Sequence, residues 1–214
     1  MIFITLLFVA GLSYKIVAGV LALGVPTSII GIILILKHAL PLNEYQYKRI
    51  YSWLQPSKYA DDAYQQQNSI MAIGSGQLWG KGLNNSSIAS MKNGNFISEP
   101  QTDFIFAVVG EELGFIGCVI VIVLLLLIVF ECILIAKNAK DLGGRLICCG
   151  MAALIGFQSF INICVTTGLM PNTGLPLPFV SYGLTSLMSL FIGLGLVLNV
   201  GLQARKYHGL GDIE

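Results

Sequence analysis

Charged side chains are scarce in this sequence. They make up 11% of its 214 residues, against about 25% in a typical soluble domain, and residues 146–204 contain no Asp, Glu, Lys or Arg at all. The net charge of +1 offers no basic surface to nucleic acid. With 55% apolar residues, the chain cannot cover a water-facing surface, which excludes a soluble enzyme and a nucleic-acid-binding protein.

Disulfide and metal-binding patterns are lacking as well. The five cysteines all lie in apolar runs, and no CxxC or Cys/His spacing occurs. We therefore expect the cysteines to be small core residues and expect no metal site. The N-terminus also lacks the basic start and the small-residue cleavage site of a signal peptide.

Long apolar runs are what the sequence has instead. A bilayer core about 30 Å thick is crossed by roughly 20 helical residues. Residues 1–11 reach only about 16 Å and are interpreted as a partial span, so that 1–214 would be a single membrane domain cut from a larger one. The predicted fold class is all-α, a polytopic helical membrane protein with one partial and four complete spans. The complete spans are expected at residues 16–36, 113–136, 147–168 and 183–203.

The distribution of basic residues predicts the orientation. The connector 137–145 holds three basic residues and the tail 204–214 opens with two, whereas the connector 169–182 has none. Short basic connectors stay in the cytoplasm, so the C-terminal tail is predicted to be cytoplasmic. Residues 37–112 then form a large extracytoplasmic loop. Within it we expect short interfacial helices at residues 45–54 and 69–78.

Residues 74–82 form a glycine-rich run that does not fit a nucleotide-binding motif. A P-loop needs Gly five places before its Gly-Lys pair and Ser or Thr after it, and Ser75 and Gly82 stand there. What remains is a flexible turn with exposed amides and one cation, Lys81. Such a turn could contact a phosphate, and a plain interfacial loop is the alternative.

A second motif covers residues 98–106. Ser98 and Gln101 have capping-box spacing, which predicts a helix that starts there and runs into the span at 113–136. Small residues on one face of this helix would let another helix approach closely. That face is predicted to comprise Asp103, Ala107, Gly110, Gly114 and Gly117.

Three acidic residues of this predicted helix lie between its start and the apolar span: Asp103, Glu111 and Glu112. A carboxylate at the membrane surface is costly unless it is used or paired, so Asp103 is either a functional group or a residue that favours the positive helix N-terminus. Glu111 and Glu112 are expected on the solvated surface of the helix, with a pair between one of them and a loop cation as the alternative.

The connector from residue 168 to residue 183 is apolar but contains three prolines and three glycines. It cannot be helical, and irregular backbone near a membrane must be buried in protein or line a wet cavity. We expect it to form part of a rigid pocket wall at the outer side, beside Asp103.

Together these motifs resemble the SEDS family of peptidoglycan glycosyltransferases, the FtsW/RodA/SpoVE group, with a leaning towards the RodA branch. The resemblance covers nearly the whole chain and implies that the chain is the C-terminal half of such a protein. The matching motifs are Tyr64-Gln65, residues 72–76 with 80–82, residues 102–107 with 110–114, Pro171, residues 173–179 and residues 181–183.

The resemblance implies a multi-pass protein of the bacterial plasma membrane that polymerises lipid II for elongation, division or sporulation. Asp103 matches the essential extracytoplasmic aspartate of the family. The implied partners are lipid II, membrane lipid and a class B penicillin-binding protein transpeptidase, with no nucleic acid. A divalent cation is one candidate cofactor. The residues implied in substrate binding are Gly80, Lys81, Gly82 and Ser181.

In the implied reaction a sugar hydroxyl attacks the donor sugar. Because a hydroxyl is a weak nucleophile, a carboxylate must take its proton, and Asp103 is the candidate. The leaving pyrophosphate needs positive charge, from Lys81, from residues outside this chain or from a divalent ion. We expect this chain alone to be inactive.

Two other functions stay open at this point: a lipid-linked precursor flippase, and a non-catalytic scaffold for a transpeptidase. Coupled transporters tend to keep ionisable groups near the bilayer midplane. Here the acidic residues gather at the outer surface instead, which favours an enzyme.

Overall fold

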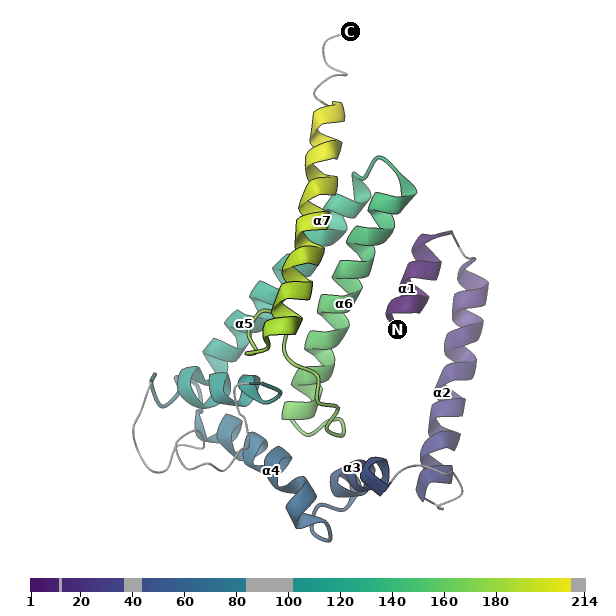
Figure 1. Cartoon of the computed structure of the whole chain (residues 1–214). Helices are drawn as coiled ribbons and strands as arrows, with labels where there is room; N and C mark the ends of the chain where they lie inside the picture. Colours follow the sequence, from purple (N-terminus) through teal and green to yellow (C-terminus); the bar gives the residue numbers. More distant parts are fainter. Residues whose placement is uncertain (12, 37–43, 84–101, 209–214) are drawn as a thin grey trace.

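The computed structural model of the chain describes residues 1–11, 13–36, 44–83 and 102–208. Within these ranges the chain is helical and contains no strand, which confirms the predicted all-α class (Figure 1). The helices are α1 (Ile2–Val9), α2 (Tyr14–Leu36), α3 (Glu44–Leu54), α4 (Ala60–Ser75), α5 (Ile105–Lys137), α6 (Leu142–Thr166) and α7 (Leu184–His208).

Three of the described helices are long and apolar enough to cross a bilayer: α5, α6 and the part of α7 from Leu184 to Gln203. They coincide with the spans predicted at 113–136, 147–168 and 183–203, and a polytopic helical membrane protein is thereby confirmed. The 23-residue helix α2 and the 8-residue helix α1 coincide with the predicted span and partial span at the N-terminus. That these two also enter the membrane stays a prediction.

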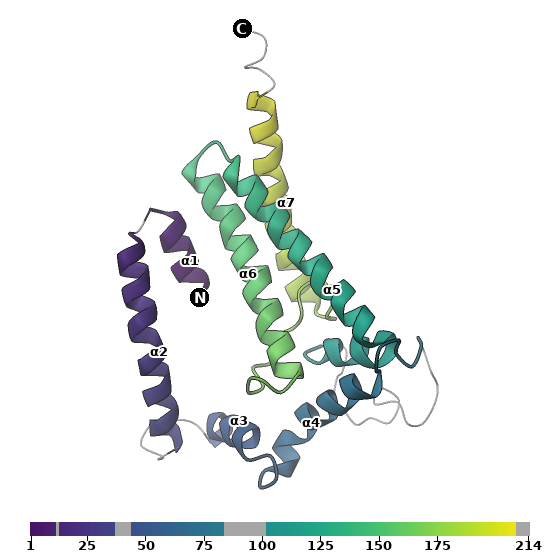
Figure 2. The same cartoon turned by 180° about the vertical axis from the view of Figure 1, so that it is seen from behind.

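Helix α6 lies at the centre of the bundle. Helices α5 and α7 pack against it, and α1 packs against another of its faces (Figures 1 and 2). Phe106, Leu125, Ile155 and Leu190 form the main apolar core between them. All five cysteines are free thiols. Four of them are buried, which confirms that these are small core residues, whereas Cys149 is only half-buried.

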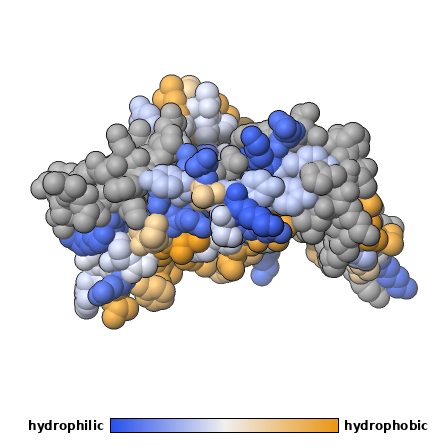
Figure 3. Space-filling model, turned by 90° about the horizontal axis from the view of Figure 1, so that it is seen from below, coloured by the Kyte–Doolittle hydropathy of each residue, from blue (hydrophilic) through white to orange (hydrophobic). Residues whose placement is uncertain are grey.

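The segments that carry the sequence motifs gather at one end of this bundle. Helices α3 and α4, the start of α5 and the connector between α6 and α7 lie there, whereas the α5–α6 connection and the end of α7 lie at the other end (Figures 1 and 2). Hydrophilic side chains occupy much of the motif-bearing end (Figure 3). This sidedness agrees with the predicted alternation of the connectors, and which end faces the cytoplasm stays a prediction.

The orientation can be tested with single cysteines in the full-length protein (this chain with any residues that flank it in the cell) after the native cysteines are replaced. Thr173 and Asn138 are both exposed and lie at opposite ends of the bundle. In intact cells Thr173→Cys should react with a membrane-impermeant thiol reagent and Asn138→Cys should not, because basic connectors stay inside. The reverse labelling pattern would contradict the orientation.

The two helices predicted in the long loop differ in outcome. Helix α3 matches the prediction at residues 45–54. The prediction at residues 69–78 is wrong, because α4 begins at Ala60 and ends at Ser75. The helix stops there since Gly76 follows as its C-cap and Gln77 adopts a left-handed φ of 51°, a conformation that does not continue a right-handed helix.

The predicted helix through Asp103 also needs correction. Residues 98–101 lie outside the described residues, but 102–104 form a turn and α5 begins only at Ile105. Gly114 then breaks α5, with φ 68° and ψ −164°. The prediction of one continuous helix face from Asp103 to Gly117 is therefore wrong. The close approach that this face predicted does occur, since Gly110 is buried against Ile73 of α4.

Candidate functional site

Asp103 lies in the turn just before α5 and is half-buried. Its backbone carbonyl accepts a hydrogen bond from Asn162 Nδ2 of α6 at 2.8 Å. The same nitrogen donates to the Leu175 carbonyl at 2.6 Å. One buried amide from a membrane helix therefore ties the Asp103 turn to the connector between α6 and α7, which fixes the backbone on which the carboxylate stands.

Ser181 ties the same two segments together at a second point. Its buried hydroxyl accepts a hydrogen bond from the Leu177 N–H at 2.7 Å and donates one to the Thr102 carbonyl at 2.6 Å. Ser181 thus positions the residue that precedes Asp103. A direct contact of Ser181 with substrate stays a prediction.

Polar side chains hold the rest of the irregular connector, as its burial near a membrane requires. Trp53 Nε1 of α3 donates to the Gly168 carbonyl at 2.8 Å. From α4, Gln66 Nε2 donates to the carbonyls of Val165 and Met170, both at 2.7 Å. The connector is therefore a fixed wall held by side chains of α3, α4 and α6. Its Gly174 lies near Asp103, since a Cβ built on this glycine would be 3.5 Å from Asp103 Oδ2, as expected from the sequence; that this is the outer side stays a prediction.

Arg49 is the charged neighbour of Asp103 that the sequence did not reveal. Its Nη1 donates to the Asn172 carbonyl at 2.9 Å. Gly174 has a left-handed φ of 70°, and a Cβ built on it would lie 3.5 Å from Asp103 Oδ2 and 3.9 Å from Arg49 Nη2. A carboxylate and a guanidinium thus border the same glycine. No spacing rule links them, because they come from helix α3 and from a turn far along the chain.

The glycine-rich turn after α4 is not a cradle of exposed amides, so that expectation is wrong. The Gly80 N–H donates to the Gly76 carbonyl at 2.8 Å, the Lys81 N–H to the Glu111 carbonyl at 2.9 Å, and the Gly82 N–H to the Glu112 carbonyl at 3.0 Å. The first of these bonds closes the turn on itself, and the break in α5 uses the amides of Lys81 and Gly82. Substrate contacts by Gly80, Lys81 and Gly82 stay predictions.

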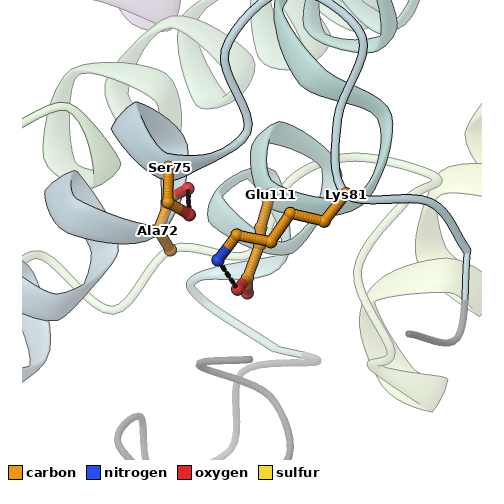
Figure 4. A network of polar contacts seen from close by, with 4 residues as sticks. All are labelled: Ala72, Ser75, Lys81 and Glu111. Atoms are coloured by element: carbon orange, nitrogen blue, oxygen red, sulfur yellow. Dashed lines mark hydrogen bonds and ion pairs between the residues drawn. The ribbon is translucent and has the colours of Figure 1, made fainter. Parts of the chain in front are cut away.

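Lys81 forms an ion pair with Glu111, with 2.8 Å between Nζ and Oε1 (Figure 4). The Glu111 side chain is only 2% exposed and that of Lys81 is 28% exposed. The expectation of a solvated Glu111 is therefore wrong, and the alternative of a pair with a loop cation is confirmed. The side chain of Glu112 is half-buried.

These observations define the class of the protein: a multi-span helical membrane protein with a charged site built on irregular backbone at one end of its bundle. The family described as "Cell cycle protein" and named for FtsW, RodA and SpoVE has a sequence profile that matches residues 1–206. The chain belongs to this family.

Individual relatives agree with the family assignment. The chain is 38% identical over 205 residues to "Stage V sporulation protein E" of Bacillus subtilis (strain 168), covering 94% of this chain and 52% of that protein. It is 37% identical over 207 residues to "Probable peptidoglycan glycosyltransferase FtsW" of Haemophilus ducreyi, covering 94% and 49%. These names are those of the sporulation and division branches, and the leaning towards RodA stays a prediction.

A solved structure is similar along nearly the same length. It is described as "Structural coordination of polymerization and crosslinking by a peptidoglycan synthase complex". The TM-score is 0.64 at 30% sequence identity, with 94% of this chain and 52% of the other covered. The chain thus spans about half the length of the relatives that it matches.

Proposed function

We propose that the protein is a peptidoglycan glycosyltransferase that polymerises lipid II at the outer surface of the bacterial plasma membrane. The relatives named as probable peptidoglycan glycosyltransferases support this proposal. The observation that carries it is the arrangement around Gly174: a Cβ built on this glycine would lie 3.5 Å from the Asp103 carboxylate and 3.9 Å from the Arg49 guanidinium. A transfer between phosphate-linked sugars needs a base and a positive charge near each other.

Asp103 is the proposed general base. The 4-hydroxyl of the acceptor sugar attacks the anomeric carbon of the donor and gives its proton to the Asp103 carboxylate. A new carbon–oxygen bond forms while the bond to the pyrophosphate breaks, and undecaprenyl pyrophosphate leaves with the electron pair. Because the displacement occurs in one step, the configuration at the anomeric carbon inverts.

Arg49 is the proposed source of positive charge for the leaving pyrophosphate. A planar guanidinium matches phosphate oxygens better than an ammonium does, and Lys81, the candidate that the sequence suggested, is bonded to Glu111. A divalent cation held between a carboxylate and the phosphates of the substrate is the alternative source of positive charge.

Arg49→Met tests this role. A hydrogen bond to a charged group contributes about 1.5–3 kcal/mol, so we expect the polymerisation rate of the full-length protein to fall by roughly 10- to 160-fold. Arg145→Met is the matched control, since Arg145 is exposed and lies in the first turn of α6, at the end of the bundle away from Asp103. Equal rates for the two variants would remove Arg49 from the mechanism.

The proposed partner is a class B penicillin-binding protein transpeptidase. The similar structure is described as that of a complex that coordinates polymerisation with crosslinking, and crosslinking is the chemistry that a transpeptidase supplies. The proposed setting is the bacterial plasma membrane with the C-terminus in the cytoplasm, in keeping with the basic α5–α6 connector.

Reconstitution in liposomes distinguishes the proposed enzyme from a flippase or a scaffold. Purified full-length protein should convert fluorescent lipid II into glycan polymer and release undecaprenyl pyrophosphate for each bond formed. Transbilayer movement of lipid II without polymer would favour a flippase. Polymer that forms only when an active partner polymerase is added would favour a scaffold.

A further inference from the structure

The break in α5 removes two regular helical hydrogen bonds. In an unbroken helix the N–H of Phe115 would donate to the Glu111 carbonyl, and that of Ile116 to the Glu112 carbonyl. The non-helical backbone at Gly114 separates these groups. They lie at the start of the span predicted at residues 113–136, and unsatisfied backbone groups are costly in a membrane.

The turn after α4 supplies replacement partners for all four groups. Phe115 N–H donates to the Gln77 carbonyl at 2.8 Å and Ile116 N–H to the Leu78 carbonyl at 3.3 Å. In return, the carbonyls of Glu111 and Glu112 accept from the backbone N–H groups of residues 81 and 82 of the turn. Residues 77–82 are thus inserted into the helix at its break, and they hold its first part, residues 105–113, in place.

Glycines make this insertion sterically feasible. A Cβ on Gly76 would overlap the Gly110 carbonyl oxygen, and one on Gly80 would overlap the Glu112 carbonyl group. A Cβ on Gly114 would in turn overlap the backbone nitrogen of Gly80. The glycines of the run at 74–82 that are in contact therefore serve backbone-to-backbone packing.

Glu111 is the group that makes this arrangement sensitive to charge. Glu111 as a whole is only 1% exposed to solvent, and a buried carboxylate needs a compensating charge. Lys81 of the turn provides an ammonium 2.8 Å away. About 9 Å of helix separates Ile105 from Glu111, so a shift of Glu111 towards water would also move Asp103, which directly precedes the helix.

We propose that Lys81 is a positioning residue for the transfer reaction, acting through Glu111 rather than through the phosphates of the substrate. It neutralises the buried carboxylate, keeps residues 105–113 against the turn and so holds Asp103 where it can accept a proton. This inference rests on the proposed glycosyltransferase function.

The test compares Lys81→Met with the double variant Lys81→Met/Glu111→Gln in the full-length protein. Lys81→Met leaves the carboxylate buried without this ammonium, and we expect kcat for lipid II polymerisation to fall at least ~10-fold, with KM within about twofold of wild type. The double variant has no charge left to compensate and keeps the backbone bonds of the turn. Its kcat should return to within about threefold of wild type.

Other outcomes overturn the inference. A raised KM that persists in the double variant would show that Lys81 contacts the substrate. An unchanged kcat per folded molecule in Lys81→Met, with only the yield of protein reduced, would show a purely structural role. If Lys81→Met does not accumulate, the double variant decides alone, because it lacks the ammonium entirely. Absence of polymer from the wild type would instead refute the proposed function.

Discussion

Replacing Asp103 with asparagine is expected to lower lipid II polymerisation by the full-length protein at least ~100-fold, because a positioned general base contributes about 10²–10⁴-fold to such a reaction. Asparagine keeps the size of the side chain but cannot take a proton from the acceptor hydroxyl. The carbonyl that receives the Asn162 bond belongs to the backbone, so the turn should stay in place. Thermal stability should therefore hardly change.

Asp61→Asn is the matched control for this variant. It makes the same chemical change on α4, at an exposed position at the same end of the bundle. We expect it to keep wild-type turnover. If Asp103 only favoured the helix terminus, Asp103→Asn would cost at most about 0.3–1 kcal/mol of stability and would leave turnover nearly intact, contrary to the proposal.

Gly114→Ala is expected to have the second-largest effect. The backbone at φ 68° and ψ −164° lies in a region that is essentially restricted to glycine, and the new methyl group would overlap the turn. We expect a loss of about 2–5 kcal/mol in unfolding free energy. We also expect a fall of about 10²-fold in turnover, because residues 105–113 and Asp103 move when the turn is displaced.

Gly195→Ala in α7 is the matched control, and we expect it to keep wild-type turnover and to be at least as stable as wild type. No atom lies within 4 Å of a Cβ built there, and alanine favours a helix over glycine by about 1 kcal/mol. Thermal unfolding in detergent and turnover of lipid II should be measured for both variants. A Gly114→Ala protein as stable and active as wild type would show that the break in α5 is not needed.

The spans could be predicted from the sequence because a bilayer sets a length and a composition that individual contacts cannot override. Residues 113–136, 147–168 and 183–203 were recognisable for that reason. The break at Gly114 was not, because a glycine in an apolar helix fits equally well as a close-packing residue. Only the partner segment at 77–82 makes the break favourable, and that segment is remote in sequence.

The candidate site, too, was predictable from the sequence in part only. Asp103 stood out because a carboxylate beside a long apolar run is costly, and its turn was correctly placed beside the connector at Gly174. Arg49 gave no comparable signal, since a basic residue on an amphipathic helix is ordinary. The run around Lys81 suggested a turn with exposed amides, whereas the structure uses the Lys81 and Gly82 amides and the neighbouring glycines to approach the backbone of α5. A contact of Lys81 with substrate stays a prediction.

Chemical rescue tests the central claim, that Asp103 is the general base of a sugar transfer, most directly. Single-turnover polymerisation of lipid II should be measured for wild type and Asp103→Ala, with and without added formate. We expect Asp103→Ala to be at least ~100-fold slower than wild type. Added formate should raise the rate of Asp103→Ala at least ~10-fold, because a small carboxylate can occupy the vacated space and take the proton. It should leave the rate of the wild type unchanged. Wild-type turnover by Asp103→Ala in the absence of formate would contradict the account.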